Sequence, residues 1–221
     1  MGWDFAGAEP EFQRALALAP SDASTHGAYG WCLTVLGKYP DALAQYQQAH
    51  ELDPLSPKTL TDIGDLYSVS RQYQQALDYY QQAIQLAPDF WWGYFNRALI
   101  RWYEGDVKAA IPDAEKAVVL ADNFPLTEGV LGQLYGISGR RADALKILDR
   151  LKEQAGHRYV TPAAFVGVYA GLGDNDRAFQ WLEKLYEERS DFLLWLKQPI
   201  WDGVRSDPRF QAIYKKVGLP P

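Results

Sequence analysis

The sequence contains little of several features that would indicate particular functions. Cys32 is the only cysteine among 221 residues, so the chain forms neither an internal disulfide nor a cysteine-rich zinc site. The longest apolar stretches, such as residues 163–170, are well short of the roughly 20 residues that span a bilayer. The N-terminus also lacks a basic segment followed by an apolar run. We therefore expect no membrane anchor and no signal peptide, and the cytoplasm is the expected compartment.

Basic residues are outnumbered by acidic ones. The 22 Lys and Arg against 28 Asp and Glu give a formal net charge of -6 and a pI near 5.1. This balance opposes nucleic-acid binding, because that binding gains its affinity when basic side chains release counterions from phosphates. With 48% hydrophobic residues, the chain can bury a substantial core. We expect a folded protein that does not bind nucleic acid directly.

An alanine recurs every 34 residues through most of the chain. An apolar residue follows four positions later and another stands three positions beyond it, which is the spacing of one face of an α-helix. The alanines are Ala8, Ala42, Ala76, Ala110, Ala144 and Ala178, and the residues after them are Phe12, Tyr46, Tyr80, Ala114, Leu148 and Leu182. Prolines that stop a helix close the first three units, at Pro20, Pro54 and Pro88. Glycines typical of helix ends mark the turns between paired helices, at Gly37, Gly105, Gly139 and Gly173.

These residues resemble the tetratricopeptide repeat (TPR), whose unit carries W-x2-L-G-x2-Y, then A-x3-F, A and P. Gly64 with Tyr67, and Gly132 with Tyr135, match the small residue and the aromatic of its first helix. The resemblance implies an all-α fold: a right-handed superhelix of antiparallel helix pairs with a C-terminal capping helix, as a single domain over residues 1–221. The expected parts are the second helix of a truncated repeat (4–20), full repeats (23–56, 57–90, 91–124, 125–158 and 159–192) and a cap (193–221).

Both ends depart from the repeat. The chain opens on a second helix whose first helix is missing, so we expect an excised domain with further repeats or another domain upstream. This unpaired helix is expected to expose Phe5, Phe12 and Leu16. At the other end, Asp207 is the expected N-cap of a final helix, with Pro208 at its first position.

The C-terminal part is similar to a narrower group, the TPR regions of bacterial multidomain proteins. Those proteins join TPRs to winged-helix, serine/threonine kinase or nucleotide cyclase domains. The similar stretches are residues 158–162, 169–174, 181–184, 186–190 and 205–210, and residues 3–9 resemble the start of their repeats. This resemblance implies a bacterial regulatory setting.

No arrangement of side chains in the sequence indicates catalysis. His26, His50 and His157 lie far apart in the sequence, without the spacing of metal ligands. Residues 171–176 lack the Lys-Ser/Thr pair of a phosphate loop and the glutamate of a calcium loop, so they are interpreted as a turn. We expect no enzyme activity, no cofactor and no metal, and we expect Cys32 to be a buried, inert thiol.

In TPR proteins the first helices line a concave groove, so the resemblance assigns partner contacts to positions 2, 5, 6, 9 and 12 of each repeat. The candidates are Trp31, Lys58, Asp62, Asp65, Trp92, Phe95, Asn96, Leu99, Trp102 and Gln133. Tryptophans flanked by carboxylates suit an apolar or basic peptide. The alternative is that Trp92 and Trp102 only pack against neighbouring first helices. Asp62 and Asp65 would repel the C-terminal carboxylate that some TPR grooves bind, which disfavours a co-chaperone role.

Three charged residues, Arg97, Arg101 and Glu128, stand where the repeat usually has core residues. A buried charge must be paired or reach water. Either they form an Arg–Glu bridge between adjacent repeats or, as we prefer, their aliphatic stems pack while the charged heads extend to solvent.

Together, the residues and the resemblance indicate a protein-interaction scaffold or sensory module that binds a peptide or protein segment in its groove. Its partners are expected to include neither nucleic acid nor membrane. The alternative is a homodimerisation module that acts through the unpaired N-terminal helix.

Overall fold

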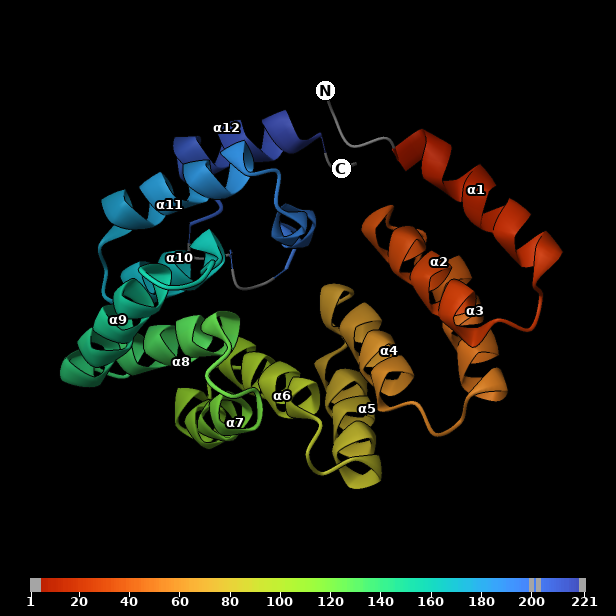
Figure 1. The fold of residues 1–221 in the computed structure, drawn as a ribbon, viewed down its shortest axis with the longest axis horizontal. Helices are drawn as coiled ribbons and strands as arrows, with labels where there is room; N and C mark the ends of the chain where they lie inside the picture. Colours follow the sequence, from red (N-terminus) through yellow and green to blue (C-terminus); the bar gives the residue numbers. More distant parts are fainter. Residues whose placement is uncertain (1–4, 199–200, 202–203, 219–221) are drawn as a thin grey trace. The chain divides into compact units, whose positions relative to one another are not determined.

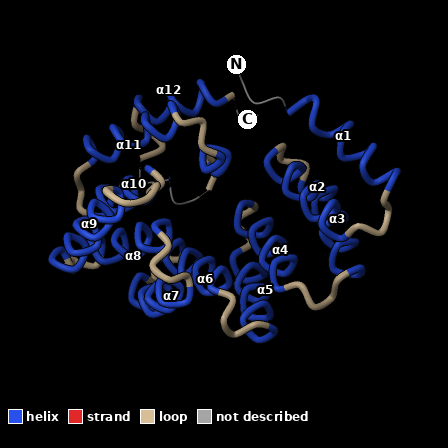
Figure 2. The backbone as a smooth tube through the Cα atoms, in the orientation of Figure 1, coloured by secondary structure: helices blue, strands red, loops and turns tan. Residues whose placement is uncertain are grey.

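The computed structural model describes residues 5–198, 201 and 204–218, and the regular structure in this part of the chain is entirely helical (Figure 2). The helices are α1 (Phe5–Leu18), α2 (Ala23–Val35), α3 (Tyr39–Leu52), α4 (Pro57–Val69), α5 (Tyr73–Leu86), α6 (Trp91–Tyr103), α7 (Val107–Leu120), α8 (Pro125–Ile137), α9 (Arg141–Ala155), α10 (Pro162–Gly171), α11 (Asn175–Glu187), the 3₁₀ segment η1 (Asp191–Trp195) and α12 (Pro208–Val217). Each expected full repeat contains one helix pair, as Figure 1 shows. The fold is an all-helical α-solenoid.

The chain divides into two compact units. Unit 1 comprises residues 1–93 and 214–221, and unit 2 comprises residues 94–213. In unit 1, α2 packs on α3 and α4 on α5, while α1 packs on α2 and α3 on α4. In unit 2, α8 packs against α7, α9 and α10, and α10 packs on α11.

Local sequence signals explain where the helices begin and end. Side chains at the N-caps accept backbone hydrogen bonds and so satisfy the exposed N–H groups of the first turn. These caps are Asp22, Ser56, Asp106, Thr161 and Asp174, and Asp207 accepts from the backbone of Arg209 in the same way. Proline, which lacks an N–H, occupies the first helical position at Pro57, Pro125, Pro162 and Pro208.

Small residues let the two helices of a pair approach closely. The alanine at each repeat position from Ala42 to Ala144 is fully buried. A Cβ added at Gly30 would lie 2.7 Å from the ring of Tyr46, and one at Gly64 would clash with the ring of Tyr80. In the first two full repeats, a glycine on the first helix therefore makes room for a tyrosine on the second.

A second close approach joins α8 to α10 in unit 2. A Cβ at Gly129 would lie 2.5 Å from the Cα of Ala164, and a Cβ at Gly167 would lie 2.9 Å from the backbone oxygen of Gly129. Gly136 and Gly171 likewise face backbone atoms of the opposite helix. The backbones of the two helices therefore touch along their length.

The expectation that α1 exposes its apolar face was wrong in part for the two residues that the structure describes, because both are half-buried. Phe12 stacks on Tyr29 of α2 with ring centroids 5.4 Å apart, and both Phe12 and Leu16 pack against the unit 1 core. The side chain of Phe5 lies outside the described residues. Because α1 packs on α2, it partly buries these side chains without a helix pair of its own.

The C-terminal segment is held by two arginines. Arg205 donates hydrogen bonds to the backbone oxygens of Leu196, Lys197 and Gln198. Arg209, in the first turn of α12, pairs with Asp207 and Asp176 and lies 4.0 Å from the ring centre of Phe179 on α11. The apolar run after residue 190 forms the short 3₁₀ segment η1, and Leu193 and Leu196 in this region are buried.

Candidate protein-binding face

Two carboxylates of α4 lie on the side of that helix that faces α2 and the start of α6. Asp62 accepts a hydrogen bond from Lys58 at 2.6 Å, and its Oδ2 lies 3.9 Å from where a Cβ would stand on Gly27 of α2. Asp65, one turn further along α4, accepts a hydrogen bond from the hydroxyl of Tyr80 at 2.7 Å. Trp92, at the start of α6, also donates a hydrogen bond to Asp65.

The position of Trp31 on α2 assigns it to the same surface. It follows Gly27 by four positions, which places both residues on the same side of α2. Trp31 is half-buried and packs against the unit 1 core, which includes Ile63 of α4. Ala28, on the same side of α2, is exposed. We call the surface formed by Trp31, Asp62, Asp65 and Trp92 the acid–aromatic face.

Both carboxylates of this face are partly withdrawn from water. Burial raises the pKa of Asp62 against the opposing effect of Lys58. Burial also raises the pKa of Asp65 to about 7, and the negative charge of Asp62 adds to the rise while the hydrogen bond from Tyr80 opposes it. The face therefore holds two desolvated carboxylates with one lysine beside them.

The structure brings together half of the residues that the sequence predicted as partner contacts. Trp31, Lys58, Asp62, Asp65 and Trp92 all belong to unit 1. The others belong to unit 2, where Phe95, Asn96 and Gln133 are buried and Leu99 and Trp102 are half-buried.

Trp92 and Trp102 make different contacts. Trp92 bonds to Asp65 of the neighbouring first helix, as the packing alternative requires, yet part of its side chain stays accessible. Trp102 lies beside Tyr103, with ring centroids 5.6 Å apart. Trp92 thus both packs against α4 and contributes to an accessible surface.

Both interpretations of the charged core residues were wrong for the arginines. Arg97 does not extend to solvent but forms a bidentate ion pair with Asp113 on α7. Two guanidinium nitrogens of Arg97 donate to the two carboxylate oxygens of Asp113, at 2.7 and 2.8 Å. Arg101 reaches the same carboxylate at 2.9 Å. Asp113 stands where the preceding and following repeats have Tyr79 and Ile147. The signal in the sequence was that Arg97 and Asp113 depart from the apolar pattern in the same repeat.

Glu128 does form a bridge to an arginine, but within its own repeat. It is fully buried in α8, pairs with Arg150 of α9 and accepts a hydrogen bond from Gln154 at 2.8 Å. Burial raises the pKa of Glu128, and the charge of Arg150 opposes the rise. The bridge ties α8 to α9.

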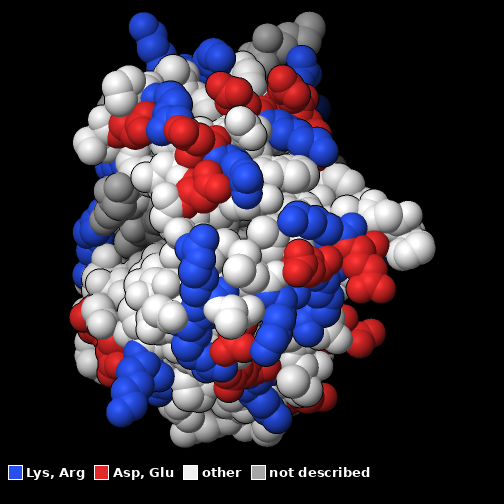
Figure 3. All heavy atoms as spheres, turned by 90° about the vertical axis from the view of Figure 1, so that its left-hand side faces the viewer, with Lys and Arg blue, Asp and Glu red and all other residues white. Residues whose placement is uncertain are grey.

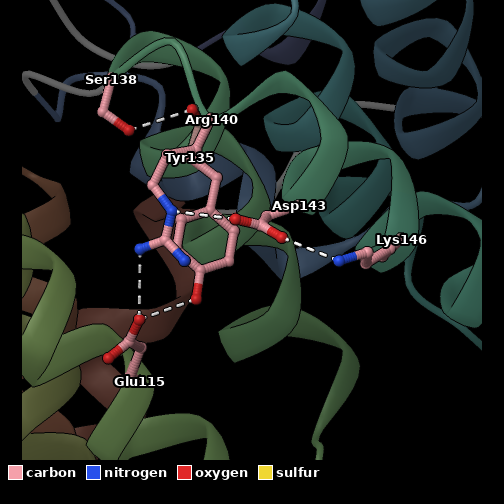
Figure 4. A network of polar contacts seen from close by, with 6 residues as sticks. All are labelled: Glu115, Tyr135, Ser138, Arg140, Asp143 and Lys146. Carbon is pink, nitrogen blue, oxygen red and sulfur yellow. Dashed lines mark hydrogen bonds and ion pairs between the residues drawn. The ribbon is translucent and has the colours of Figure 1, made fainter.

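A further polar network, drawn in Figure 4, links α7, α8 and α9. Arg140 lies 4.0 Å from the ring centre of Tyr135 and pairs with Glu115 and Asp143. Tyr135 donates to Glu115 at 2.8 Å, and Lys146 pairs with Asp143 at 3.1 Å. These charges satisfy one another, so the network is better suited to joining helices than to binding a ligand.

Charge is distributed unevenly along the chain. Residues 1–93 contain four basic and eleven acidic residues, a net charge of −7, and Lys215 and Lys216 reduce this to −5 for unit 1. Unit 2 contains 16 basic and 17 acidic residues. On the side of the molecule that carries α9, residues of both signs are interspersed (Figure 3). The acidic excess of the protein therefore belongs to unit 1.

Metal ligands do not cluster in the part of the chain that the structure describes, where no group of three or more His, Cys, Asp or Glu could hold an ion. Among the same described residues, no helix is long and apolar enough to cross a membrane. Cys32 is buried, and burial raises the pKa of its thiol.

Stacked antiparallel helix pairs with small residues between them define a helical-repeat protein. Family models for the tetratricopeptide repeat match residues 4–57 and 57–90, so this part of the chain is built from TPRs. No curated protein sequence matches the chain.

Solved structures, among them TPR proteins, share the fold over most of the chain. TTC0263, a thermophilic TPR protein of Thermus thermophilus, aligns with a TM-score of 0.65 and 22% identity over 76% of this chain and 90% of its own. PilF of Pseudomonas aeruginosa aligns with a TM-score of 0.60 and 16% identity over 96% of this chain and 90% of its own. YrrB is described as a TPR protein with an unusual peptide-binding site. It aligns with a TM-score of 0.51 and 24% identity over 83% of this chain and 94% of its own. At these identities the likeness establishes the fold alone.

Proposed function

We propose that the protein is a non-catalytic scaffold that binds a segment of a partner protein on the acid–aromatic face. The observation that carries the proposal is the approach of Asp62 to Gly27 of α2 and of Asp65 to Trp92 at the start of α6, with Trp31 one turn beyond Gly27. Tryptophan provides a large rigid contact area, and partly desolvated polar groups beside it provide orientation.

The fold supports this proposal. TPRs bind protein or peptide partners, and YrrB is described as having a peptide-binding site. A solenoid presents its first helices as a continuous surface suited to an extended or helical segment. The resemblance of the C-terminal part to bacterial regulators favours a regulatory, cytoplasmic setting for this binding.

Peptide selection tests the proposal directly. Peptides of 12 residues selected from a random display library on the full chain are expected to bind wild type and to lose binding to Ala28→Tyr. Ala28 is exposed on α2 beside Trp31, so a bulky side chain there obstructs the acid–aromatic face without entering the core.

The matched control is Gln47→Tyr, which adds the same ring at an exposed position of α3. Its binding is expected to equal that of wild type. If no selected peptide distinguishes Ala28→Tyr from Gln47→Tyr, the proposed face is not the binding surface.

Self-association through α1 is the second candidate, and Leu18 is the observation that favours it. The side chain of Leu18 is 82% exposed at the end of α1. Phe12 is unsuitable as a probe of such an interface, because it stacks on Tyr29 and its replacement would disturb the α1–α2 contact. Leu18→Glu tests the interface without that effect.

A further inference from the structure

The acid–aromatic face has an imbalance of charge that identifies the chemistry of its partner. Asp62 and Asp65 lie on the same side of α4, one turn apart, and the charge of Asp62 raises the cost of ionising Asp65. Lys58 bonds to Asp62, and its own side chain is 71% exposed against 15% for Asp62. The positive charge of one exposed lysine therefore acts on two partly buried carboxylates.

The other helices of unit 1 bring uncharged groups to these carboxylates. Gly27 of α2 lies against Asp62, Tyr80 of α5 bonds to Asp65, and Trp92 of α6 bonds to Asp65. Burial raises the pKa of Tyr46 of α3, and both carboxylates are near enough to add to the rise. These neighbours fix the positions of the carboxylates without adding positive charge.

The other three basic residues between positions 1 and 93 contact groups outside the acid–aromatic face. Arg14 pairs with Glu11, Lys38 pairs with Glu9 at 2.6 Å, and Arg71 reaches the hydroxyl of Tyr73 at 3.4 Å. With four basic and eleven acidic residues in this segment, the wider field of unit 1 also attracts positive charge.

Resting on the proposed function, we infer that the acid–aromatic face binds a positively charged segment of its partner, with a lysine or arginine placed between Asp62 and Asp65. The cationic head donates charge-assisted hydrogen bonds to the two carboxylates. Trp92 bonds to Asp65, Trp31 stands one turn beyond Gly27 on α2, and an indole ring attracts a cation over its face. Acidic segments are repelled, and unit 2, with its balanced charge, contributes no such preference.

The test uses the same 12-residue display library with two variants of the full chain. Asp62→Asn/Asp65→Asn neutralises the face while keeping the shape of both side chains. Glu51→Gln/Asp78→Asn removes the same amount of charge from exposed positions on α3 and α5 of the same unit. This pair separates local recognition from the general field of the unit.

Peptides selected on wild type are expected to be enriched in Lys and Arg. They should bind Asp62→Asn/Asp65→Asn at least about tenfold more weakly, the effect of losing one charge-assisted hydrogen bond. Binding to Glu51→Gln/Asp78→Asn should stay within about twofold of wild type, because exposed charges at a distance are screened by salt. The single variants Asp62→Asn and Asp65→Asn are each expected to show part of the loss, and thermal unfolding by circular dichroism verifies that all variants fold.

Failure of this inference differs from failure of the proposed function. Peptides that are blocked by Ala28→Tyr but show no basic enrichment, or bind Asp62→Asn/Asp65→Asn as well as wild type, overturn the inference and leave the binding face in place. A selection that yields no peptide blocked by Ala28→Tyr overturns both.

Discussion

At the scale of single residues, Asp65 makes the stability of unit 1 depend on pH. Its pKa is about 7 in the folded protein, well above the value of 3.8 that it has when exposed. The folded state therefore binds the proton more tightly than the unfolded state, and the stability present below pH 4 is lost as the pH rises to about 7. Asp65→Asn keeps an uncharged side chain at every pH.

We expect wild type to lose up to about 4 kcal/mol relative to Asp65→Asn between about pH 4 and pH 8, measured by urea unfolding at each pH. The loss should be concentrated around pH 5 to 7, because the unfolded state has already released its proton there while the folded state still holds it. Parallel stability curves for the two proteins would show that Asp65 is not desolvated.

Arg71 occupies a backbone conformation that favours glycine. Its φ of 60° lies in the left-handed region, at the turn position where other repeats have Gly37, Gly105 and Gly139. A side chain in this region costs about 1 kcal/mol. Arg71→Gly is therefore expected to stabilise the protein by about 0.5–1 kcal/mol in thermal or urea unfolding.

The reverse substitution provides the control. Gly105 has a φ of 87°, and a Cβ there would meet nothing within 4 Å, so Gly105→Ala probes backbone strain alone. It should destabilise the protein by about 1 kcal/mol. If both substitutions change stability in the same direction, the turn conformation is not the cause.

At the scale of helices, Asp113 joins α6 to α7. It is 5% exposed and receives two arginines, so its removal leaves two partly buried cations without this carboxylate. Asp113→Ala is expected to destabilise unit 2 by about 3 kcal/mol in urea unfolding. Lys116→Ala, at an exposed position of the same helix, should change stability by under about 0.5 kcal/mol. Equal effects of the two substitutions would contradict a structural role for the ion pair.

The helices themselves could be predicted from the sequence because their signals are local. The 34-residue spacing from Ala42 to Ala178 placed each helix pair, and Asp207 with Pro208 marked the start of the last helix. The ion pairs could not be predicted in this way. Whether Arg97 reaches solvent or Asp113 depends on the distance between two helices, and sequence periodicity does not give that distance.

The candidate site was predictable only in part, for a related reason. The repeat position assigned Trp31, Asp62 and Trp92 to the groove side of their helices, and all three lie in unit 1 and are partly accessible. The same rule also selected Phe95 and Gln133, which are buried. Helical position indicates direction, but exposure depends on how closely the neighbouring helices pack, as the α8–α10 contact shows.

At the scale of the whole molecule, the account predicts a monomer. Phe12 and Leu16, the residues that an unpaired helix would offer to a second copy, are already packed against unit 1. Light scattering across a concentration series should give a mass near 25.0 kDa for wild type and for Leu18→Glu alike. A concentration-dependent dimer that Leu18→Glu abolishes would instead support self-association through α1.

The central claim is that a protein segment binds on the acid–aromatic face, and fluorine NMR of protein labelled with 5-fluorotryptophan tests it most directly. The eight tryptophans give separate probes, which single Trp→Phe variants assign. Addition of a selected basic peptide should shift the signals of Trp31 and Trp92 in unit 1 and leave that of Trp181 in unit 2 unchanged. Saturable binding that shifts Trp181 but neither Trp31 nor Trp92 would contradict the claim.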